Sequence, residues 1–126
     1  MSEKAIKTRY GDEELKEFEE IIDKKLEKSR NELSFYLKQI TELADNPDSK
    51  FKGLDDGLGT AENERLTTLA ARVQKHMQHL ENAKIRIKNK VYGICRVTGK
   101  LISKERLRAV PHATLSIEAK QQGAEN

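Results

Sequence analysis

The stretch "DEELKEFEEIIDKKLEKSRNELSFYLKQITEL", residues 12–43, decides the fold, because its apolar side chains recur at steps of three and four. The stripe consists of Leu15, Phe18, Ile22, Leu26, Leu33, Leu37, Ile40 and Leu43, with Ser29 on the one missing rung. This spacing predicts an amphipathic helix whose narrow apolar seam suits coiled-coil packing. Gly11-Asp12 opens the helix, acidic first turns suit the helix dipole, and Pro47 ends it at the latest.

A second stripe of the same kind follows after a loop. It consists of Leu66, Leu69, Val73, Met77, Leu80, Ala83 and Ile87. We expect this helix to start after Gly59, with Thr60 as its N-cap, and to end before Tyr92. Neither helix buries its seam alone, so we expect the chain to fold back into an antiparallel hairpin as a monomer. A dimer formed through the seams is the competing solution.

The segment "DNPDSKFKGLDDGLGT", residues 45–60, separates the two helices and is rich in turn-forming residues. Because the flanking helices match in length, the segment is expected to be the exposed tip of the hairpin. Asp55 and Asp56, flanked by Gly53 and Gly57, form the acidic pair best placed to reach into a partner.

After residue 90 the pattern changes. "VYGICRVTGKLI", residues 91–102, alternates apolar and polar residues and predicts a short β-hairpin that turns at Thr98–Lys100. Ser103 opens a helix of one or two turns, and Thr114 is expected to cap a short C-terminal helix. We therefore divide the chain into an N-terminal segment (1–11), a hairpin (12–90, tip at 45–60) and a small base (91–126).

The base has the spacing of a four-cysteine zinc finger but lacks most of its sulfur. The four ligand positions read Cys95, Thr98, Ser116 and Ala119. A structural zinc site needs four thiolate or imidazole ligands, so we expect the zinc site to be lost. Burial of the many apolar residues nearby offsets the lost metal. The predicted fold is mainly α: a long antiparallel coiled-coil hairpin with a small degenerate zinc-finger-like α+β base and a short C-terminal helix.

Composition limits the possible functions of the chain. It has 126 residues, of which 36% are apolar and 36% charged, and a single cysteine. One cysteine excludes an internal disulfide, and with no apolar leader or membrane span the expected location is the cytoplasm. No nucleophile–base constellation or phosphate-binding loop is present, so the protein is not expected to be an enzyme. His76 and His79 are expected to be solvated helix residues.

Charge is distributed unevenly along the chain, although the net charge is only +3. Residues 12–20 are acidic, whereas residues 84–110 carry five Lys and four Arg against Glu105 alone. A stretch this basic suits a phosphate backbone, so an alternative function is binding of DNA or RNA through residues 84–110.

The order of parts resembles the DksA/TraR family of bacterial transcription regulators. The likeness rests on the helical hairpin, on "YGIC" (residues 92–95) and on "RLRAVP" (residues 106–111), and it covers about residues 10–122. The resemblance implies binding to RNA polymerase rather than to promoter DNA. The coiled coil is then expected to enter the secondary channel and bring its acidic tip to the active site, in a zinc-independent branch of the family.

The resemblance also implies roles for single residues. Asp55 matches the acidic tip pattern, and Asp56 replaces its missing acid. The cations expected to anchor the base on the polymerase are Arg106, Arg108 and Lys120. No cofactor is expected: among the positions that bind the alarmone ppGpp in the family, Lys120 matches, but His79 and Val110 stand where basic side chains are expected. A secondary-channel factor that assists transcript cleavage remains an alternative.

Overall fold

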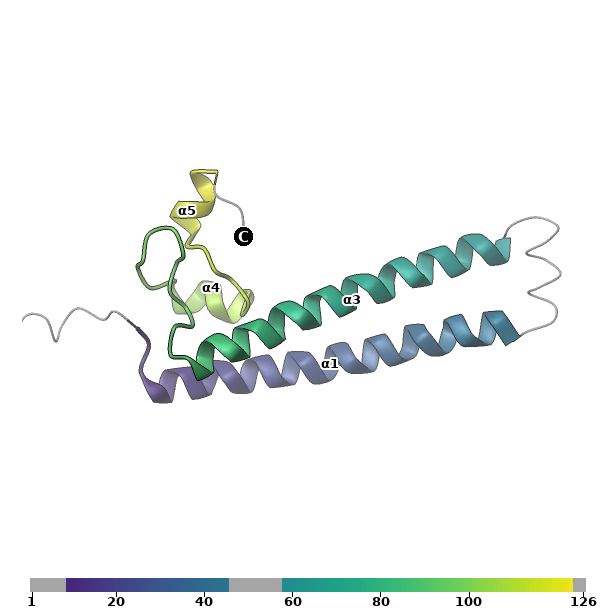
Figure 1. The fold of residues 1–126 in the computed structure, drawn as a ribbon, viewed down its shortest axis with the longest axis horizontal. Helices are drawn as coiled ribbons and strands as arrows, with labels where there is room; N and C mark the ends of the chain where they lie inside the picture. Colours follow the sequence, from purple (N-terminus) through teal and green to yellow (C-terminus); the bar gives the residue numbers. More distant parts are fainter. Residues whose placement is uncertain (1–8, 46–57, 124–126) are drawn as a thin grey trace, which may run out of the picture. The chain divides into compact units, whose positions relative to one another are not determined.

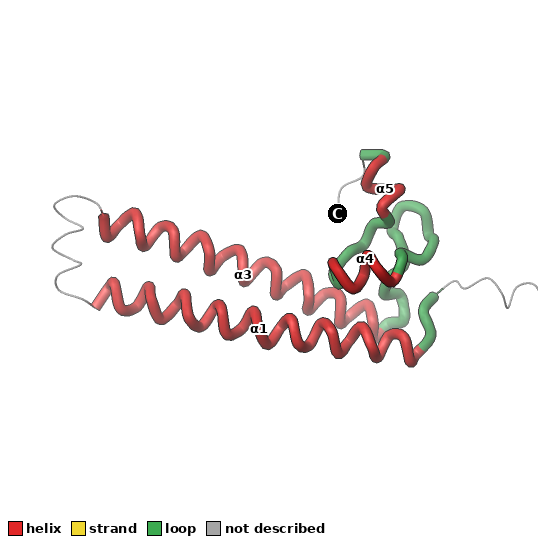
Figure 2. Tube along the Cα trace, turned by 180° about the vertical axis from the view of Figure 1, so that it is seen from behind, coloured by secondary structure: helices red, strands yellow, loops and turns green. Residues whose placement is uncertain are grey.

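A computed structural model describes residues 9–45 and 58–123 of the chain, and it is mostly helical (Figure 1). The elements are α1 (Asp12–Asp45), α3 (Leu58–Lys88), α4 (Lys104–Ala109) and α5 (Ile117–Gln121). Contacts divide the chain into two compact units: residues up to Lys25 together with those from His79 onward, and Leu26–Gln78. Within each unit α1 and α3 lie side by side and antiparallel (Figures 1 and 2), which confirms the predicted helical hairpin.

The helix boundaries agree with the sequence pattern at three of their four ends. α1 begins at Asp12, where the Leu15 N–H donates to the Gly11 carbonyl (2.9 Å) and the Glu14 carboxylate accepts from the Gly11 N–H (3.0 Å). α3 begins at Leu58, so Thr60 lies inside the helix, and its prediction as the N-cap is wrong. A single glycine such as Gly59 costs a helix only about 1 kcal/mol, which the continued backbone hydrogen bonding offsets.

In the second unit, the seam of α1 departs from the predicted stripe near the tip. Leu37 is 46% exposed, whereas Tyr36 is half-buried, so the prediction of Leu37 as a seam residue is wrong. The seam instead follows Leu26, Ser29, Leu33, Tyr36, Ile40 and Leu43. These steps alternate strictly between three and four, which is the heptad spacing of a coiled coil. Packing against the partner helix α3 therefore places Tyr36, one position before Leu37, in the seam.

The second unit buries few side chains completely. Leu26 and Ser29 of α1 and Leu66 and Ala70 of α3 are buried, while the predicted seam residue Met77 is only half-buried. Ser29 occupies a rung where a large apolar residue would remove more surface from water. The paired helices are consequently held by a narrow seam, as the sparse apolar stripe predicts.

The core of the first unit is built around Phe18. Its ring is fully buried and lies 5.6 Å from the Tyr10 ring at 66° and 5.3 Å from the Tyr92 ring at 43°. The Tyr10 hydroxyl donates a hydrogen bond to the Ile102 carbonyl. Edge-to-face and tilted aromatic pairs each contribute about 0.5–1.5 kcal/mol beyond the area that they bury. Phe18 thus joins Tyr10, which precedes α1, to Tyr92 in the segment after α3.

The predicted β-hairpin of the base is reduced to a single antiparallel bridge between Ile94 and Leu101 in the described residues. The Cys95 N–H donates to the Lys100 carbonyl (2.8 Å), and the Gly99 N–H donates to the Cys95 carbonyl (2.8 Å), which closes the turn where it was predicted. The ladder does not lengthen because the Arg96 N–H bonds to the Thr114 carbonyl (2.9 Å) instead.

Gly93 allows the base to approach the N-terminal aromatic ring. Its φ is +79°, and a Cβ at this position would lie 2.7 Å from two ring atoms of Tyr10. A side chain here is therefore excluded both by the left-handed backbone and by the ring. Gly99 also has a positive φ, +72°, but nothing lies within 4 Å of the Cβ that it lacks.

Replacement of Gly93 by Ala should destabilise the protein more than replacement of Gly99 by Ala. Gly99→Ala is expected to cost only the strain of a left-handed conformation, about 1–2 kcal/mol. Gly93→Ala adds overpacking against Tyr10 and should cost about 1–3 kcal/mol more. Urea unfolding of the two variants measures the difference, and equal free energies of unfolding would contradict the close approach.

Candidate functional site

The structure brings the four finger positions together in the first unit. Cys95, Ser116 and Ala119 are buried, with exposed fractions of 1%, 6% and 0%. The Thr98 N–H donates to Cys95 Sγ (3.4 Å), and Ser116 Oγ accepts from the Ala119 N–H (3.1 Å). The positions are therefore linked in pairs by hydrogen bonds that follow the spacing of the two C-x-x-C motifs.

Hydrogen bonds also change the acidity of the one cysteine. Burial raises the pKa of Cys95, but hydrogen bonds from the Thr98 side chain and from the backbone of Ser116, Thr98 and Val97 outweigh it and lower the pKa from 9.0 to about 6. Hydrogen bonding to a charged form favours that form. A thiolate is thus stabilised at the position where the family of four-cysteine fingers has a metal ligand.

The residues at the finger positions do not fit a zinc ion. Zinc takes four ligands from Cys, His, Asp or Glu, and only Cys95 is of that kind. Ser116 Oγ is engaged as a helix cap, and the methyl group of Ala119 has no donor atom. Among residues 9–45 and 58–123, no group of three or more His, Cys, Asp and Glu side chains is arranged to hold a metal ion.

The cap of the C-terminal helix differs from its prediction. α5 begins at Ile117 with Ser116 as its N-cap, so the prediction of Thr114 is wrong. The Thr114 carbonyl accepts from the Arg96 N–H, which fixes this residue in the segment before the helix. Ser103 caps α4 as predicted, since its Oγ accepts from the Arg106 N–H (3.2 Å).

The free energy of unfolding should depend on pH through Cys95. The folded pKa of about 6 lies below the ordinary value of 9.0, so between these values the unfolded thiol binds a proton that the folded protein does not. Wild-type stability relative to Cys95→Ala should therefore rise from pH 6 to pH 9 and be lost as the pH falls toward 6. Urea unfolding at several pH values measures this, and parallel pH profiles of the two proteins would contradict it.

The three predicted anchoring cations have different surroundings. Arg106 is half-buried, and its Nε donates to the Leu115 carbonyl (2.8 Å). Arg108 lies 3.6 Å from the Glu17 carboxylate. Lys120 is exposed near the end of α5. Arg106 thus holds the segment before α5, whereas the charge of Lys120 faces solvent.

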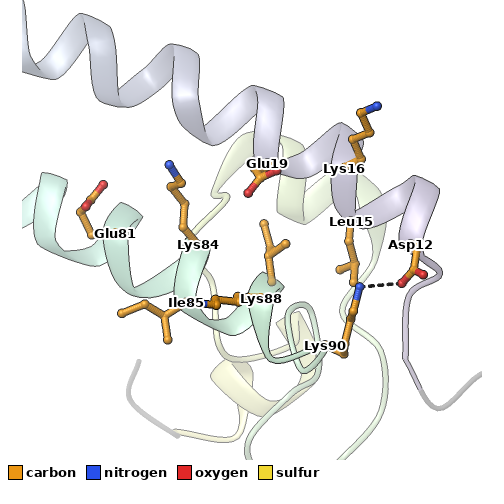
Figure 3. A pocket seen from close by; sticks show the side chains of 10 residues that line it. Asp12, Leu15, Lys16, Glu19, Glu81, Lys84, Ile85, Lys88 and Lys90 are labelled. Carbon is orange, nitrogen blue, oxygen red and sulfur yellow. Dashed lines mark hydrogen bonds and ion pairs between the residues drawn. The ribbon is translucent and has the colours of Figure 1, made fainter.

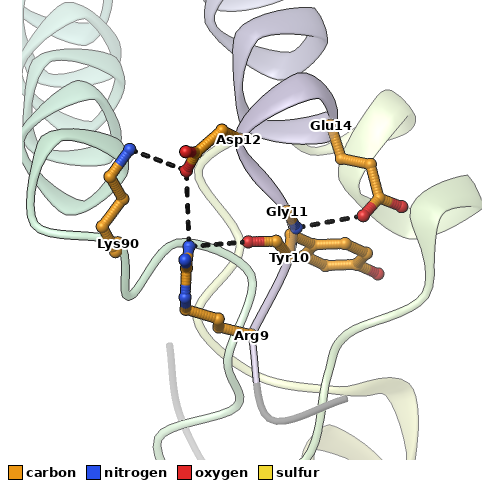
Figure 4. A network of polar contacts seen from close by, with 6 residues as sticks. All are labelled: Arg9, Tyr10, Gly11, Asp12, Glu14 and Lys90. Atoms are coloured by element: carbon orange, nitrogen blue, oxygen red, sulfur yellow. Dashed lines mark hydrogen bonds and ion pairs between the residues drawn. The ribbon is translucent and has the colours of Figure 1, made fainter. Parts of the chain in front are cut away.

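The acidic start of α1 pairs with the basic stretch 84–110. The ion pairs are Lys84–Asp23 (2.8 Å), Lys90–Asp12 (2.8 Å), Lys104–Glu14 (2.6 Å) and Arg108–Glu17 (3.6 Å). Figure 4 shows the Asp12 carboxylate between Lys90 and Arg9. The hydrogen bond from Lys90 is the main cause that lowers the pKa of Asp12. Exposed pairs contribute little stability singly, but they neutralise four of the nine cations in the stretch.

A groove of about 560 Å³ lies in the first unit between the start of α1 and the end of α3 (Figure 3). It is lined by Asp12, Leu15, Lys16, Glu19, Glu81, Lys84, Ile85, Ile87, Lys88 and Lys90. Acids and lysines alternate around its apolar floor. This mixed rim does not present the continuous positive charge that a phosphate backbone requires.

His79 and Val110, where the resemblance predicts basic side chains, lie on α3 and at the end of α4. His79 on α3 stacks on His112, with ring centroids 5.4 Å apart at 14°. His79 is exposed on α3, as expected of a solvated helix residue, and its ring also has a partner 33 positions away that periodicity does not reveal. Val110 ends α4 as its C-cap.

The predicted tip acids Asp55 and Asp56 lie outside the described residues. Among the described helices, none has the length and hydrophobicity to cross a bilayer.

Comparison with known proteins places this arrangement among related folds. Residues 90–122 match the family model described as the prokaryotic dksA/traR C4-type zinc finger. The general stress protein 16O of Bacillus subtilis (strain 168) is 30% identical over 100 residues, which cover 75% of this chain and 61% of that protein. The chain thus spans about three fifths of the length of that relative.

A solved structure has the same fold. The transcription factor DksA2 from Pseudomonas aeruginosa superposes with a TM-score of 0.78 and 23% sequence identity, covering 86% of this chain and 81% of that one. The match extends well beyond the finger, so the two long helices and the base occur together in both proteins.

Proposed function

Because residues 90–122 match the zinc-finger model of the DksA/TraR family, we propose that this chain is a transcription regulator of that family and binds RNA polymerase. It acts as a monomer in the cytoplasm and catalyses no reaction itself. The coiled coil enters the secondary channel of the polymerase and places Asp55 or Asp56 near the catalytic centre, where it modulates initiation. The observation that carries this proposal is the family match of residues 90–122, which follow two antiparallel helices of 34 and 31 residues in the chain.

The charge distribution supports binding through a channel. α1 and α3 expose polar and charged side chains outside a narrow seam, as a helix pair in an aqueous channel requires. Carboxylates at the tip suit a site that holds magnesium, because this ion prefers oxygen ligands. On the base, Lys120 is an exposed cation for contact with an acidic surface, while Arg106 and Arg108 orient the segments beside it.

Folding without zinc is part of this proposal. The hydrogen bonds at Cys95 and Ser116 take the places of metal–ligand bonds, and the buried residues Tyr92, Ile102 and Leu107 supply an apolar core. Fully burying an apolar side chain of this size contributes about 1.5–3 kcal/mol. Several such side chains match the contribution of a structural metal.

A chelator should leave the stability of the protein unchanged. After purification with EDTA, the Tm is expected to shift by no more than about 2 °C, because no four-ligand site contributes to folding. Differential scanning calorimetry with and without added zinc measures this. A Tm that falls on chelation and recovers with one equivalent of zinc would contradict the zinc-free fold.

The alternative of nucleic-acid binding receives little support. Four cations of the 84–110 stretch have carboxylate partners on α1, and those acids repel a phosphate backbone. Gel shifts at two salt concentrations distinguish the cases, since binding driven by phosphate contacts weakens steeply as salt rises. Strong, salt-sensitive binding of DNA or RNA would favour the alternative.

Replacement of both tip acids should separate binding from regulation. Asp55→Asn/Asp56→Asn is expected to compete with a known secondary-channel binder for core RNA polymerase within about threefold of the wild type, because in this proposal the cations of the base anchor the chain. The same variant should lose its effect on initiation in a single-round transcription assay, because the acids that approach the catalytic centre are gone.

The matched control is Asp45→Asn/Asp48→Asn, which removes two acids from the beginning of the same predicted tip. It should retain regulation. Unchanged regulation by the Asp55/Asp56 variant would overturn the tip mechanism, and absence of competition by the wild type would overturn polymerase binding. Stimulated transcript cleavage in the same assay would assign the chain to the cleavage-type factors.

A further inference from the structure

A small polar pocket lies in the first unit between α3 and the segment that precedes α5. It has a volume of about 170 Å³ and is lined by His79, Asn82, Arg86, His112 and Thr114. The three α3 residues follow one another at steps of three and four, which places them on one face of the helix. None of the five lining side chains is acidic.

Arg86 is the charged group of this pocket. It is half-buried and donates one hydrogen bond, to the His112 carbonyl at 3.3 Å. Burial is the main influence on the pKa of Arg86 and lowers it, with only an opposing contribution from Tyr92. Among residues 9–45 and 58–123 it has no carboxylate within ion-pair distance, unlike Lys84 on the same helix and Lys90 just after it.

The half-buried guanidinium of Arg86 favours a bound anion. Removal of a charge from water is costly unless an opposite charge and hydrogen bonds compensate it. A guanidinium has five donors in a planar fork, and one hydrogen bond leaves most of them for another acceptor. The amide, hydroxyl and imidazole groups around it are all able to donate to an oxyanion as well.

We propose that this pocket binds the carboxylate of an aspartate or glutamate side chain presented by the protein on which the first unit docks. The inference rests on the proposed function in so far as that protein is RNA polymerase. The guanidinium of Arg86 binds the two carboxylate oxygens as a fork, and the surrounding donors complete the shell.

Size and charge favour a carboxylate over a phosphate ligand. The volume of 170 Å³ is below the range of about 300–1,000 Å³ typical of pockets for drug-sized ligands, so a nucleotide does not fit inside. One carboxylate neutralises the single fixed charge of Arg86, whereas a phosphate dianion leaves a negative charge in a partly buried site. A docked partner also presents its side chain at high effective concentration, which a free ion lacks.

The first test compares two variants that each remove one positive charge from the end of α3. Arg86→Gln alters the pocket, whereas Lys88→Gln alters only the groove lined by Lys88, which makes it a matched control. Loss of one partner of a desolvated charge pair is expected to weaken polymerase binding by about thirtyfold or more. Lys88→Gln should weaken it less than about threefold. Arg86→Lys keeps the charge without the fork and should lie between them.

Circular dichroism and the Tm establish that each variant is folded. Should Arg86→Gln unfold, Arg86→Lys, which keeps the buried charge, provides the comparison with Lys88→Gln. Equal polymerase affinity of the Arg86 and Lys88 variants would overturn the proposal.

The second test uses the free protein and does not depend on the identity of the partner. Acetate, titrated against sodium chloride of equal ionic strength, should shift the NMR signals of the His79 and His112 rings and of the Arg86 side chain. The shifts should vanish in Arg86→Gln. No pocket-specific shift with acetate, or binding of inorganic phosphate more than about tenfold tighter than acetate, would overturn the carboxylate assignment. If the wild type fails to bind polymerase, the proposed function fails, while this titration still decides what the pocket binds.

Discussion

The contact of Phe18 with Tyr10 and Tyr92 is the interaction on which the first unit depends. The buried ring joins a residue before α1 to the segment that follows α3, and among the described residues no other Phe or Tyr ring is buried in that core. The contact requires a glycine at position 93, because the Tyr10 ring occupies the space that a Cβ would need. The finger-like base therefore takes its position in the first unit from aromatic packing on α1.

Ion pairs change how the charges of the sequence are interpreted, because they join charges that lie far apart along the chain. Taken along the chain, an acidic block and a basic block look like two separate binding surfaces. In the folded protein the acids of α1 lie beside the cations that follow, and each neutralises part of the other. The cations that have no acidic partner among the described residues then have more significance. Lys120 is exposed to solvent, while Arg86 is half-buried in a pocket whose other lining groups are polar.

In the base, three of the four positions that hold the metal in a four-cysteine finger carry residues that do not suit zinc. Hydrogen bonds from the Thr98 side chain and from the backbone of Ser116, Thr98 and Val97 stabilise the thiolate form of Cys95. A serine in place of a ligand caps the helix that begins there, and an alanine fills the space of the last one. Ser116 and Ala119 thus contribute a local hydrogen bond and packing at positions where a four-cysteine finger has metal ligands.

The sequence by itself determined the helices, the seam of the first unit, the cap at Ser103 and the resemblance to the family, because these depend on spacing within a few residues. It predicted Leu37 where the half-buried Tyr36 lies in the seam, Thr114 where Ser116 caps α5, and strands where the described residues form only a bridge between Ile94 and Leu101. Those features, like the aromatic core and the pocket at Arg86, were decided by the tertiary structure. Their partners are brought together across tens of residues, and local periodicity holds no information about such contacts.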